Sequence, residues 1–402
     1  MTATAIVTGI GVVAPNGLGT DQYWKATLAG RTGIRSLERY DPSRYPAQLA
    51  GQISDFEAAD HLPNRLLPQT DRVTRLALTA TDWALTEAGV HGGQHGEFTM
   101  GVVTSNASGG FEFTHTEINK LWRRGPKHVS VYESFAWFYA VNTGQISIRN
   151  GMRGPGAVLV SEQAGGLDAI GHARRGLRGG ATLMVTGGVD SSLDPWGWVS
   201  HLASGDLSTR RDPQSAYLPF DADANGYVPG EGGAILILER AEDACSVTTG
   251  YGRLAGHAAT FDPKPGSARP LGLARAAALA LADAGLGPSD VDVVFADAAG
   301  IVDRDRAEAQ AIAELFGPFG VPVTAPKACN GRLYAGGPPL DLVAALLSMR
   351  DGVIPPTPHV RTVPDEYRID LVCETPRKCD VAVAVVLARG RGGFNAAVVV
   401  TK

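Results

Sequence analysis

Cysteine is scarce in this sequence. Only four occur among 402 residues, and none lies within the first 244. The four are Cys245, Cys329, Cys373 and Cys379. They form no CxxC pair and no metal-ligand spacing, so the sequence predicts neither a disulfide-stabilised scaffold nor a metal site. This usage favours a reduced, cytoplasmic setting.

Charge and long apolar runs are also limited. Asp, Glu, Lys and Arg make up 19% of the residues, the formal net charge is −5, and no long run of Lys or Arg occurs. This balance argues against nucleic acid and anionic membrane surfaces as partners. No window approaches the roughly 18 continuous apolar residues of a membrane span. The first residues lack the basic and apolar regions of a signal peptide.

One short motif near the start resembles a cofactor site. Residues 9–14 read GIGVVA and match the dinucleotide-binding pattern G-x-G-x-x-A. A true site of that kind requires a helix that begins at the glycines. Here Pro15-Asn16-Gly17 follows, which is typical of a turn. We therefore expect a strand and a turn at this place, and no cofactor.

The chain contains an internal repeat. Residues 73–89 have helical periodicity, end in glycine and lead to a strand-like run at 100–105. Residues 272–285 and 291–296 repeat this order of helix, glycine and strand. A glycine after the last periodic residue is the expected C-cap of each helix.

A second matching pair follows in the same order. Residues 158–179 and 321–352 each read as a strand, a turn and a helix, the second helix covering 340–350. Apolar runs that alternate with helices predict sheets covered by helices. The sequence therefore predicts a duplicated α/β fold, a five-layered α/β/α/β/α sandwich, with one half at residues 1–245 and the other at 246–402.

The turn within the first of these units has the layout of a nucleophile elbow. The apolar run 157–160 enters a turn of small residues, and a helical pattern leaves it. The residue at the position of the nucleophile is Gln163. A carboxamide is neither a competent nucleophile nor a base. The chain thus keeps the frame of a covalent catalyst without its reactive atom.

Three further stretches carry a family resemblance. They are YESFAWFYAVNTGQ from Tyr132, DSSLDPWGW from Asp190 and LPFDADANGYVPGEG from Leu218. With the elbow, they resemble the β-ketoacyl synthases of the thiolase fold over essentially the whole length, from Ile6 to Asn395. The chain is most similar to the chain length factor, or ketosynthase β subunit, of bacterial type II aromatic polyketide synthases.

The resemblance also shows what has been replaced. Active members of that family carry a Cys at the elbow and one His in each of two later segments. The aligned positions here are Gln163, Ala299 and Arg332, while the family's Lys is retained as Lys327. Replacement at three separate segments implies that this chain does not carry out condensation.

The resemblance implies a role as a partner subunit. In the family, the β subunit pairs with an active α ketosynthase, works with an acyl carrier protein, and closes an interface tunnel that sets poly-β-keto chain length. The aligned tunnel residues are Phe111, Thr114, Ile118, Trp196 and Gly197. The aromatic segment expected at the heterodimer contact contains Tyr132, Phe135, Trp137 and Phe138, and strand 158–161 is expected to pair across the dimer.

Two alternatives remain open from the sequence. The Gln163 amide could donate to a malonyl thioester carbonyl and hold the enolate formed when CO2 leaves, or it could fill the cysteine site with its amide bonded internally. The apolar spacing of Phe111, Thr114 and Ile118 is also that of an ordinary helix core. A different function, a stand-alone acyl-transfer enzyme, would need Ser161 or Cys329 as its nucleophile.

Overall fold

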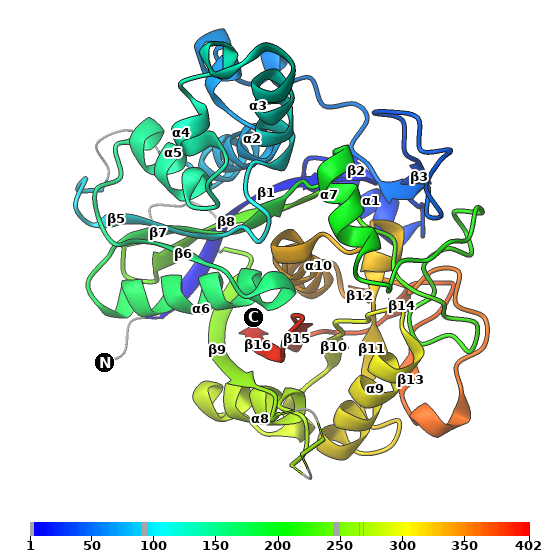
Figure 1. The fold of residues 1–402 in the computed structure, drawn as a ribbon. Helices are drawn as coiled ribbons and strands as arrows, with labels where there is room; N and C mark the ends of the chain where they lie inside the picture. Colours follow the sequence, from blue (N-terminus) through cyan, green and yellow to red (C-terminus); the bar gives the residue numbers. More distant parts are fainter. Residues whose placement is uncertain (1–3, 91–94, 244–249, 265, 268) are drawn as a thin grey trace.

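The computed structural model describes residues 4–90, 95–243, 250–264, 266–267 and 269–402 (Figure 1). The boundary expected between residues 245 and 246, and Cys245 itself, lie outside the described residues. Over the described residues, no helix is long and apolar enough to cross a membrane.

Five strands have the same order in the two halves, and the second half has one additional strand at its edge. The first half contains β1 (Ala5–Ala14), β5 (Met100–Ser105), β6 (Gly156–Leu159), β7 (Leu183–Asp190) and β8 (Gly232–Arg240), in the order β6-β5-β7-β8-β1. The second contains β9 (Gly252–Phe261), β10 (Val293–Phe295), β11 (Pro322–Thr324), β13 (Asp370–Leu371), β15 (Val383–Arg389) and β16 (Phe394–Thr401), in the order β13-β11-β10-β15-β16-β9.

Strand direction repeats as well as strand order. In each half, three neighbouring strands are parallel (β6-β5-β7 and β11-β10-β15), and the next two pair antiparallel. The two sheets meet where Ile6 and Val7 of β1 pair with Arg253 and Gly252 of β9. The duplication expected from the sequence is therefore present in the topology.

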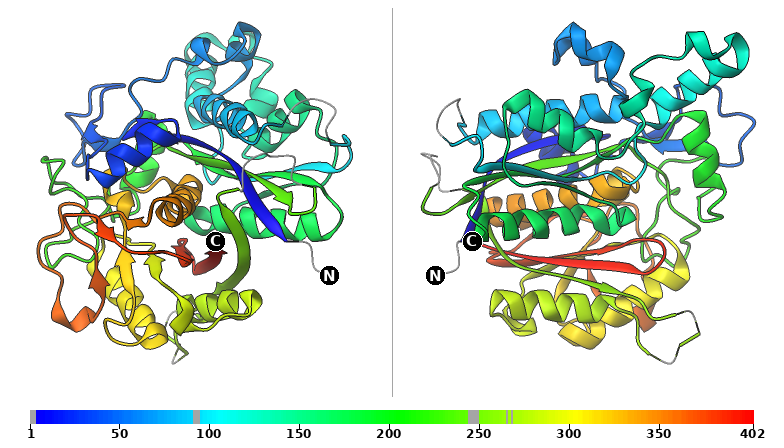
Figure 2. Two further views of the ribbon diagram at one scale, coloured as in Figure 1. Left: turned by 180° about the vertical axis from the view of Figure 1, so that it is seen from behind. Right: turned by 60° about the vertical axis from the view of Figure 1, so that its left-hand side comes forward.

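Helices complete the five layers (Figure 2). The outer helices of the first half are α2 (Arg72–Glu87) and α5 (Val141–Asn150), and those of the second are α8 (Leu273–Ala284) and α9 (Val302–Phe316). Between the sheets lie α6 (Gly165–Arg178) and α10 (Gly337–Asp351), which each contact strands of both halves. The predicted α/β/α/β/α sandwich is confirmed.

The central helix α10 is buried along almost its entire length. Its residues are buried from Gly337 to Met349, which is the pattern of a helix surrounded by protein on all sides. It begins three residues before the expected start because Pro338 and Pro339 occupy its first turn, where backbone N–H groups have no helical partner in any case.

The GIGVVA motif forms part of a strand, as expected. Gly9 and Gly11 lie within β1, and a Cβ atom on them would approach the carbonyl oxygens of Ala84 and Ala80 to 2.1 and 1.8 Å. The glycines therefore let helix α2 pack directly on β1 rather than bind a pyrophosphate.

The remaining elements surround this sandwich. They are α1 (Thr20–Leu28), α3 (Phe111–Arg124), α4 (Glu133–Ala136), α7 (Pro195–Leu202), β2 (Gly17–Leu18), β3 (Ile34–Ser36), β4 (Leu49–Gly51), β12 (Val353–Ile354) and β14 (Arg377–Lys378). Helices α3, α4 and α7 carry Phe111, Phe135 and Trp196, and the other aromatic residues singled out from the sequence flank α4.

Candidate functional site

The elbow lies where β6 runs into α6. The strand ends at Leu159, a 3-10 turn covers Glu162–Ala164, and α6 begins at Gly165. Glu162 has φ = +51°, in the left-handed region that favours glycine. Gln163 follows this reversal, and it is only 1% exposed.

The Gln163 side chain lies against the start of α10. A Cβ atom on Gly337 would be 3.0 Å from Nε2 of Gln163, so the glycine leaves room for the carboxamide. Likewise, a Cβ on Gly166 would lie 2.4 Å from the carbonyl oxygen of Ala335. The small residues of the elbow therefore allow α6 and the segment before α10 to pack closely.

The Gln163 amide has no hydrogen-bond partner in the part of the chain that the structure describes. Neither Nε2 nor Oε1 is hydrogen-bonded to any described residue. Leaving a buried polar group unpaired costs about 1–3 kcal/mol. The alternative in which the protein satisfies this amide internally is therefore wrong. Its donor and its acceptor are both free for a ligand group.

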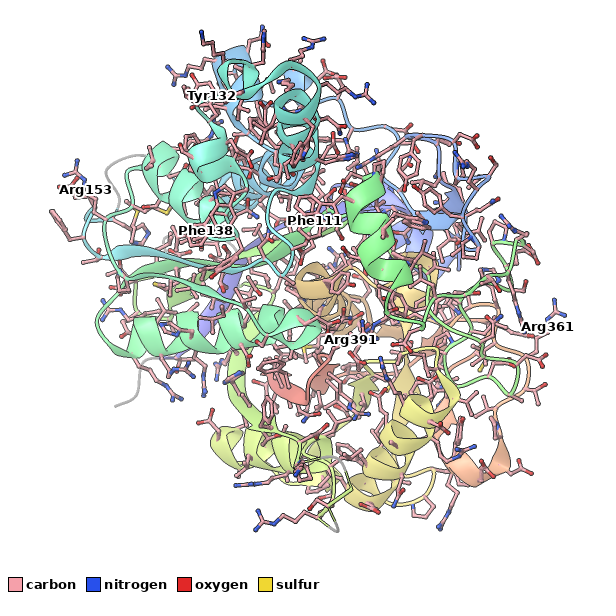
Figure 3. The ribbon with its side chains drawn as sticks, in the orientation of Figure 1. Phe111, Tyr132, Phe138, Arg153, Arg361 and Arg391 are labelled. Carbon is pink, nitrogen blue, oxygen red and sulfur yellow. The ribbon has the colours of Figure 1, made fainter. Side chains whose placement is uncertain are left out.

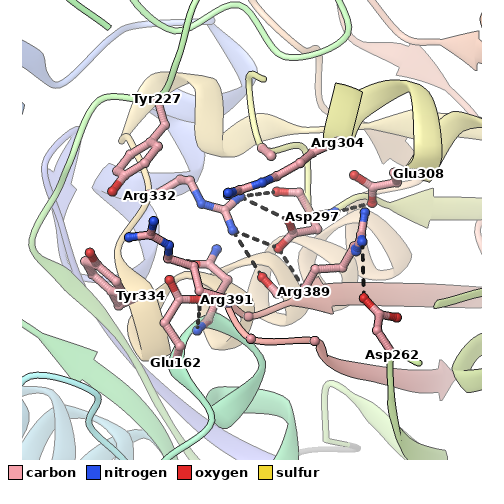
Figure 4. A pocket seen from close by; sticks show the side chains of 15 residues that line it. Glu162, Tyr227, Asp262, Asp297, Arg304, Glu308, Arg332, Tyr334, Arg389 and Arg391 are labelled. Carbon is pink, nitrogen blue, oxygen red and sulfur yellow. Dashed lines mark hydrogen bonds and ion pairs between the residues drawn. The ribbon is translucent and has the colours of Figure 1, made fainter. Parts of the chain in front are cut away.

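A polar cavity of about 240 Å³ lies at the elbow (Figure 4). Four arginines and four carboxylates contribute to its wall, and no histidine is among the described lining residues. The lining comprises Glu162, Gln163, Tyr227, Asp262, Asp297, Ala299, Arg304, Glu308, Arg332, Tyr334, Arg389 and the segment 390–393. Such a wall can bind polar or charged groups, but it contains no neutral imidazole to exchange a proton.

Arg332 occupies its position as one member of a buried ion pair. Its Nη1 lies 3.1 Å from Oδ2 of Asp297 and donates to the Asp297 carbonyl at the same distance. It also donates to the carbonyl of Arg389 at 3.3 Å. Burial alone would raise the pKa of the Asp297 carboxyl, but Arg332 and Lys327 lower it below its ordinary value. Because a guanidinium stays protonated, Arg332 cannot act as a base.

Ala299, at the position where the resemblance predicts a lost histidine, has no titratable group. It lies in the loop after β10 and is 4% exposed. Nearby, Glu308 accepts the backbone N–H groups of Asp297 and Ala298 at 2.7 and 2.8 Å. Burial, followed by the charge of Asp297, raises the pKa of Glu308 to about 7. This carboxyl group is therefore already engaged in holding the loop.

Lys327 is held by two bonds inside the protein. Its Nζ lies 2.7 Å from Oδ2 of Asp341 on α10 and donates to the carbonyl of Asp297 at 2.9 Å. Burial raises the pKa of Asp341 to about 6, although the Lys327 charge opposes that shift. The lysine thus ties the 297 loop to the central helix.

Neither alternative nucleophile is activated. Cys329 is fully buried, and burial raises the pKa of its thiol to about 12. Ser161 donates its hydroxyl hydrogen to Asp168 at 2.5 Å, and His257 lies beyond that carboxylate, 3.5 Å from its other oxygen. The serine hydroxyl thus bonds to a carboxylate, a weaker base than a neutral imidazole, and no hydrogen bond joins it to a histidine among the described residues.

The tunnel candidates are not among the residues that line the elbow cavity. Phe111, at the start of α3 and labelled in Figure 3, stacks on Trp196 of α7. The ring centroids are 5.3 Å apart and the planes 21° from parallel. Trp196 is 42% exposed. The cavity lining described above includes neither ring. The structure therefore brings these two candidates together, outside the lining of the cavity that contains Gln163.

The other tunnel candidates differ in their surroundings. Thr114 and Ile118 are both partly buried on α3. Gly197 is buried in the first turn of α7, where a Cβ atom would lie 2.3 Å from the carbonyl of Ser192. Gly197 therefore sets how closely the backbone of α7 can pack, rather than presenting a side chain.

The aromatic segment after α3 is exposed. Trp137 is 48% and Phe138 38% exposed, while Tyr132 packs edge to face on Phe135 at 5.9 Å. Further large apolar side chains on this half are also exposed: Leu121, Trp122, Val131, Tyr139, Ile148 and Val160. β6 ends the sheet order, so its outer edge has no partner strand among the described residues. Contiguous exposed apolar surface is typical of sites that bind a protein, a membrane or a ligand.

The sequence did not single out two residues of the site, Glu162 and Arg391. The Glu162 carboxylate accepts the backbone N–H groups of Gln163 and Arg391 at 2.8 and 3.0 Å. Its signal was a charged side chain in an otherwise small-residue turn, directly before the residue at the nucleophile position. The contact with Arg391 spans more than two hundred residues and is visible only once the chain is folded.

Comparison with known proteins gives the family. The model of the β-ketoacyl synthase N-terminal domain matches residues 4–244, and that of the C-terminal domain matches residues 251–361. Among solved structures, a β-ketoacyl synthase from Burkholderia phymatum superposes with a TM-score of 0.91 at 26% identity, covering 100% of this chain and 99% of that one. The ishigamide ketosynthase/chain length factor shares the fold, with a TM-score of 0.90 at 24% identity and full coverage of both chains.

Two relatives match the chain from end to end. The actinorhodin polyketide putative beta-ketoacyl synthase 2 of Streptomyces coelicolor is 64% identical over 99% of this chain and 98% of its own length. The tetracenomycin polyketide synthase ketoacyl synthase beta subunit of Streptomyces glaucescens is 57% identical over 100% and 98%. The chain therefore belongs to the β-ketoacyl synthase family, among the β subunits of polyketide ketosynthases.

Proposed function

We propose that this chain is the non-condensing β subunit of a type II polyketide synthase. It pairs with an active α ketosynthase to form the minimal synthase and shapes the interface tunnel that sets poly-β-keto chain length. The observation that carries this proposal is a complete ketosynthase scaffold in which Gln163, Ala299 and Arg332 stand at the three catalytic positions. None of these side chains can form an acyl-enzyme or shuttle a proton.

The names of related proteins support the same partners. The Streptomyces glaucescens relative is named as a ketoacyl synthase beta subunit, which implies an α subunit beside it. One structure of the same fold is a type II polyketide synthase acyl-carrier protein in complex with its ketosynthase bound to the hexaketide. We infer that this chain likewise works on chains presented by an acyl carrier protein, and in the cytoplasm, where its free cysteines stay reduced.

The stacked pair of Phe111 and Trp196 is the proposed end of the tunnel. It lies on the same half of the chain as the exposed aromatic segment and the free edge of β6. A partner that covers this half would enclose the partly exposed rings between the subunits. Large, rigid rings at that place would stop the growing chain by occupying the space that a further extension needs.

A role for Gln163 in decarboxylation is the second candidate function. The unpartnered amide favours it, since the Nε2–H could donate to a malonyl thioester carbonyl and to the enolate oxygen that replaces it. The stand-alone acyl-transfer alternative has no such support, because neither Ser161 nor Cys329 is activated.

Co-purification with an α ketosynthase tests the pairing. We expect Trp137→Ser and Phe138→Ser to weaken the complex by about 30-fold or more, the effect of removing about 2 kcal/mol at an interface hot spot. Leu279→Ser is the matched control, because Leu279 is 44% exposed on α8 in the other half. Equal losses for control and test variants, or no α subunit bound by the unaltered chain, would contradict the proposal.

A further inference from the structure

Two backbone N–H groups from distant segments converge on one oxygen at the elbow. The N–H of Gln163 and the N–H of Arg391 both donate to Oε2 of Glu162, at 2.8 and 3.0 Å (Figure 4). Backbone donors fixed in this way around one point form an oxyanion hole, which stabilises negative charge on an oxygen placed between them. Here the oxygen comes from the chain's own carboxylate.

The loop 390–393 lies close to this carboxylate oxygen, and its glycines make that contact possible. A Cβ atom on Gly390 would lie 2.5 Å from the carbonyl of Ser161 and 3.3 Å from Oε2 of Glu162. Gly392 and Gly393 have φ values of +87° and +102°, which side chains rarely adopt. The glycines of the loop 390–393 therefore allow it to pack directly on the elbow. This contact fixes the position of the second donor, the Arg391 N–H.

Glu162 stands where the backbone favours glycine. Its φ of +51° is unfavourable for a residue with a side chain, so the local conformation does not account for a glutamate. The Glu162 side chain places a carboxylate within hydrogen-bond distance of both backbone N–H groups. Next to it, the Gln163 amide is 1% exposed, lines the same cavity, and has neither donor nor acceptor engaged.

We propose that Glu162 is an internal plug of the oxyanion site. Its carboxylate excludes a thioester carbonyl from the two N–H groups and places a negative charge where an enolate would form. The inference rests on the proposed function, since the excluded ligand is the malonyl thioester of an acyl carrier. While the plug is in place, the Gln163 amide is the donor left for such a carbonyl.

The chemistry that the plug restrains is decarboxylation. The bond between the malonyl α-carbon and its carboxylate breaks, CO2 leaves, and the electron pair forms an enolate on the thioester oxygen. A proton from water then reaches the α-carbon and gives the acetyl thioester. Opening the plug supplies two backbone donors to the enolate oxygen, in addition to the Gln163 amide.

The test uses the complex with an α subunit whose elbow cysteine is replaced by alanine. Acetyl-carrier formation from malonyl-carrier is compared for the unaltered chain, Glu162→Gly and Glu162→Gln. Glycine suits the positive φ and empties the site, so we expect the rate to rise about tenfold or more. Glutamine is the matched control: it removes the charge but still reaches the donors, so its rate should fall between the other two. Equal rates for all three chains in assembled complexes would overturn the plug.

A binding measurement gives a second readout. A malonyl amide of the pantetheine arm, in which nitrogen replaces the thioester sulfur, is titrated calorimetrically into each variant. Tighter binding to Glu162→Gly than to the unaltered chain supports the plug, and equal affinity contradicts it. This titration can be made on the chain alone. Loss of pairing with the α subunit would therefore contradict the proposed function and leave the plug testable.

Discussion

At the scale of single residues, the charged side chains around the elbow are held by ion pairs inside the protein. Arg332 contributes a permanent charge to the cavity wall, and that charge is paired with Asp297. Lys327 joins the same network through Asp341. Breaking such a buried pair by removing one partner costs about 3–5 kcal/mol, because the other charge stays unpaired. These contacts therefore hold the cavity wall in place, whatever the cavity binds.

Gln163→Met separates a ligand-binding amide from a space-filling side chain. Methionine keeps a similar volume but removes the two unpaired polar atoms, so we expect the free energy of unfolding to rise by about 1–3 kcal/mol. Decarboxylation of malonyl-carrier should slow by about a hundredfold, as for loss of one preorganised donor. Denaturant unfolding and CO2 release measure the two effects. A destabilised protein with unchanged CO2 release would leave only the space-filling role.

At the scale of elements, one buried carboxylate joins α3 to α2. Asp71 caps α2 by accepting the N–H of Val73 at 2.8 Å, and it accepts the N–H of Phe113 in the first turn of α3 at the same distance. Burial raises the pKa of Asp71 to about 7, although these two bonds lower it. The helix that carries the proposed tunnel residues is thus fixed to the outer layer of the sandwich.

Phe111→Ala tests the tunnel at this scale. Removing the ring from the stack on Trp196 opens space at the proposed end of the tunnel, so the α–β complex should release longer polyketides. Phe113→Ala is the control, because Phe113 has the same ring on the same helix but faces a different cavity, with Glu112 and Lys120. Mass spectrometry of the products decides. An unchanged length for Phe111→Ala in an active complex, or the same change for both variants, would contradict the tunnel.

Elements were the easiest features to predict from the sequence. The strand at 100–105 and the helices at 73–89 and 272–285 are present within two residues of their expected bounds, because their periodicity is strong and glycines end the helices. The early start of α10 was missed because Pro338 and Pro339 read as part of a turn. The Glu162–Arg391 contact was missed because no local pattern encodes a pairing between segments so far apart.

At the scale of the whole molecule, the packing of the duplicated fold does not require a catalytic elbow. Both halves repeat one strand order, and α6 and α10 between them contact both sheets. The elbow sits at the start of α6, so its small residues serve the central packing as well as any ligand. The resemblance to ketosynthases predicted the replaced positions, and the structure brings two of them, Ala299 and Arg332, to the cavity that Gln163 lines. The unpartnered state of the Gln163 amide depends on its three-dimensional surroundings and could only come from the structure.

The most direct measurement is polyketide synthesis by complexes in which only one subunit can condense. We expect a complex of this chain with an intact α ketosynthase to extend malonyl units. A complex in which the elbow cysteine of the α subunit is replaced by alanine should make no polyketide. This chain alone, supplied with malonyl-carrier, should also make none. Polyketide formed by this chain alone, or by the complex with the altered α subunit, would contradict the central claim that the chain does not condense.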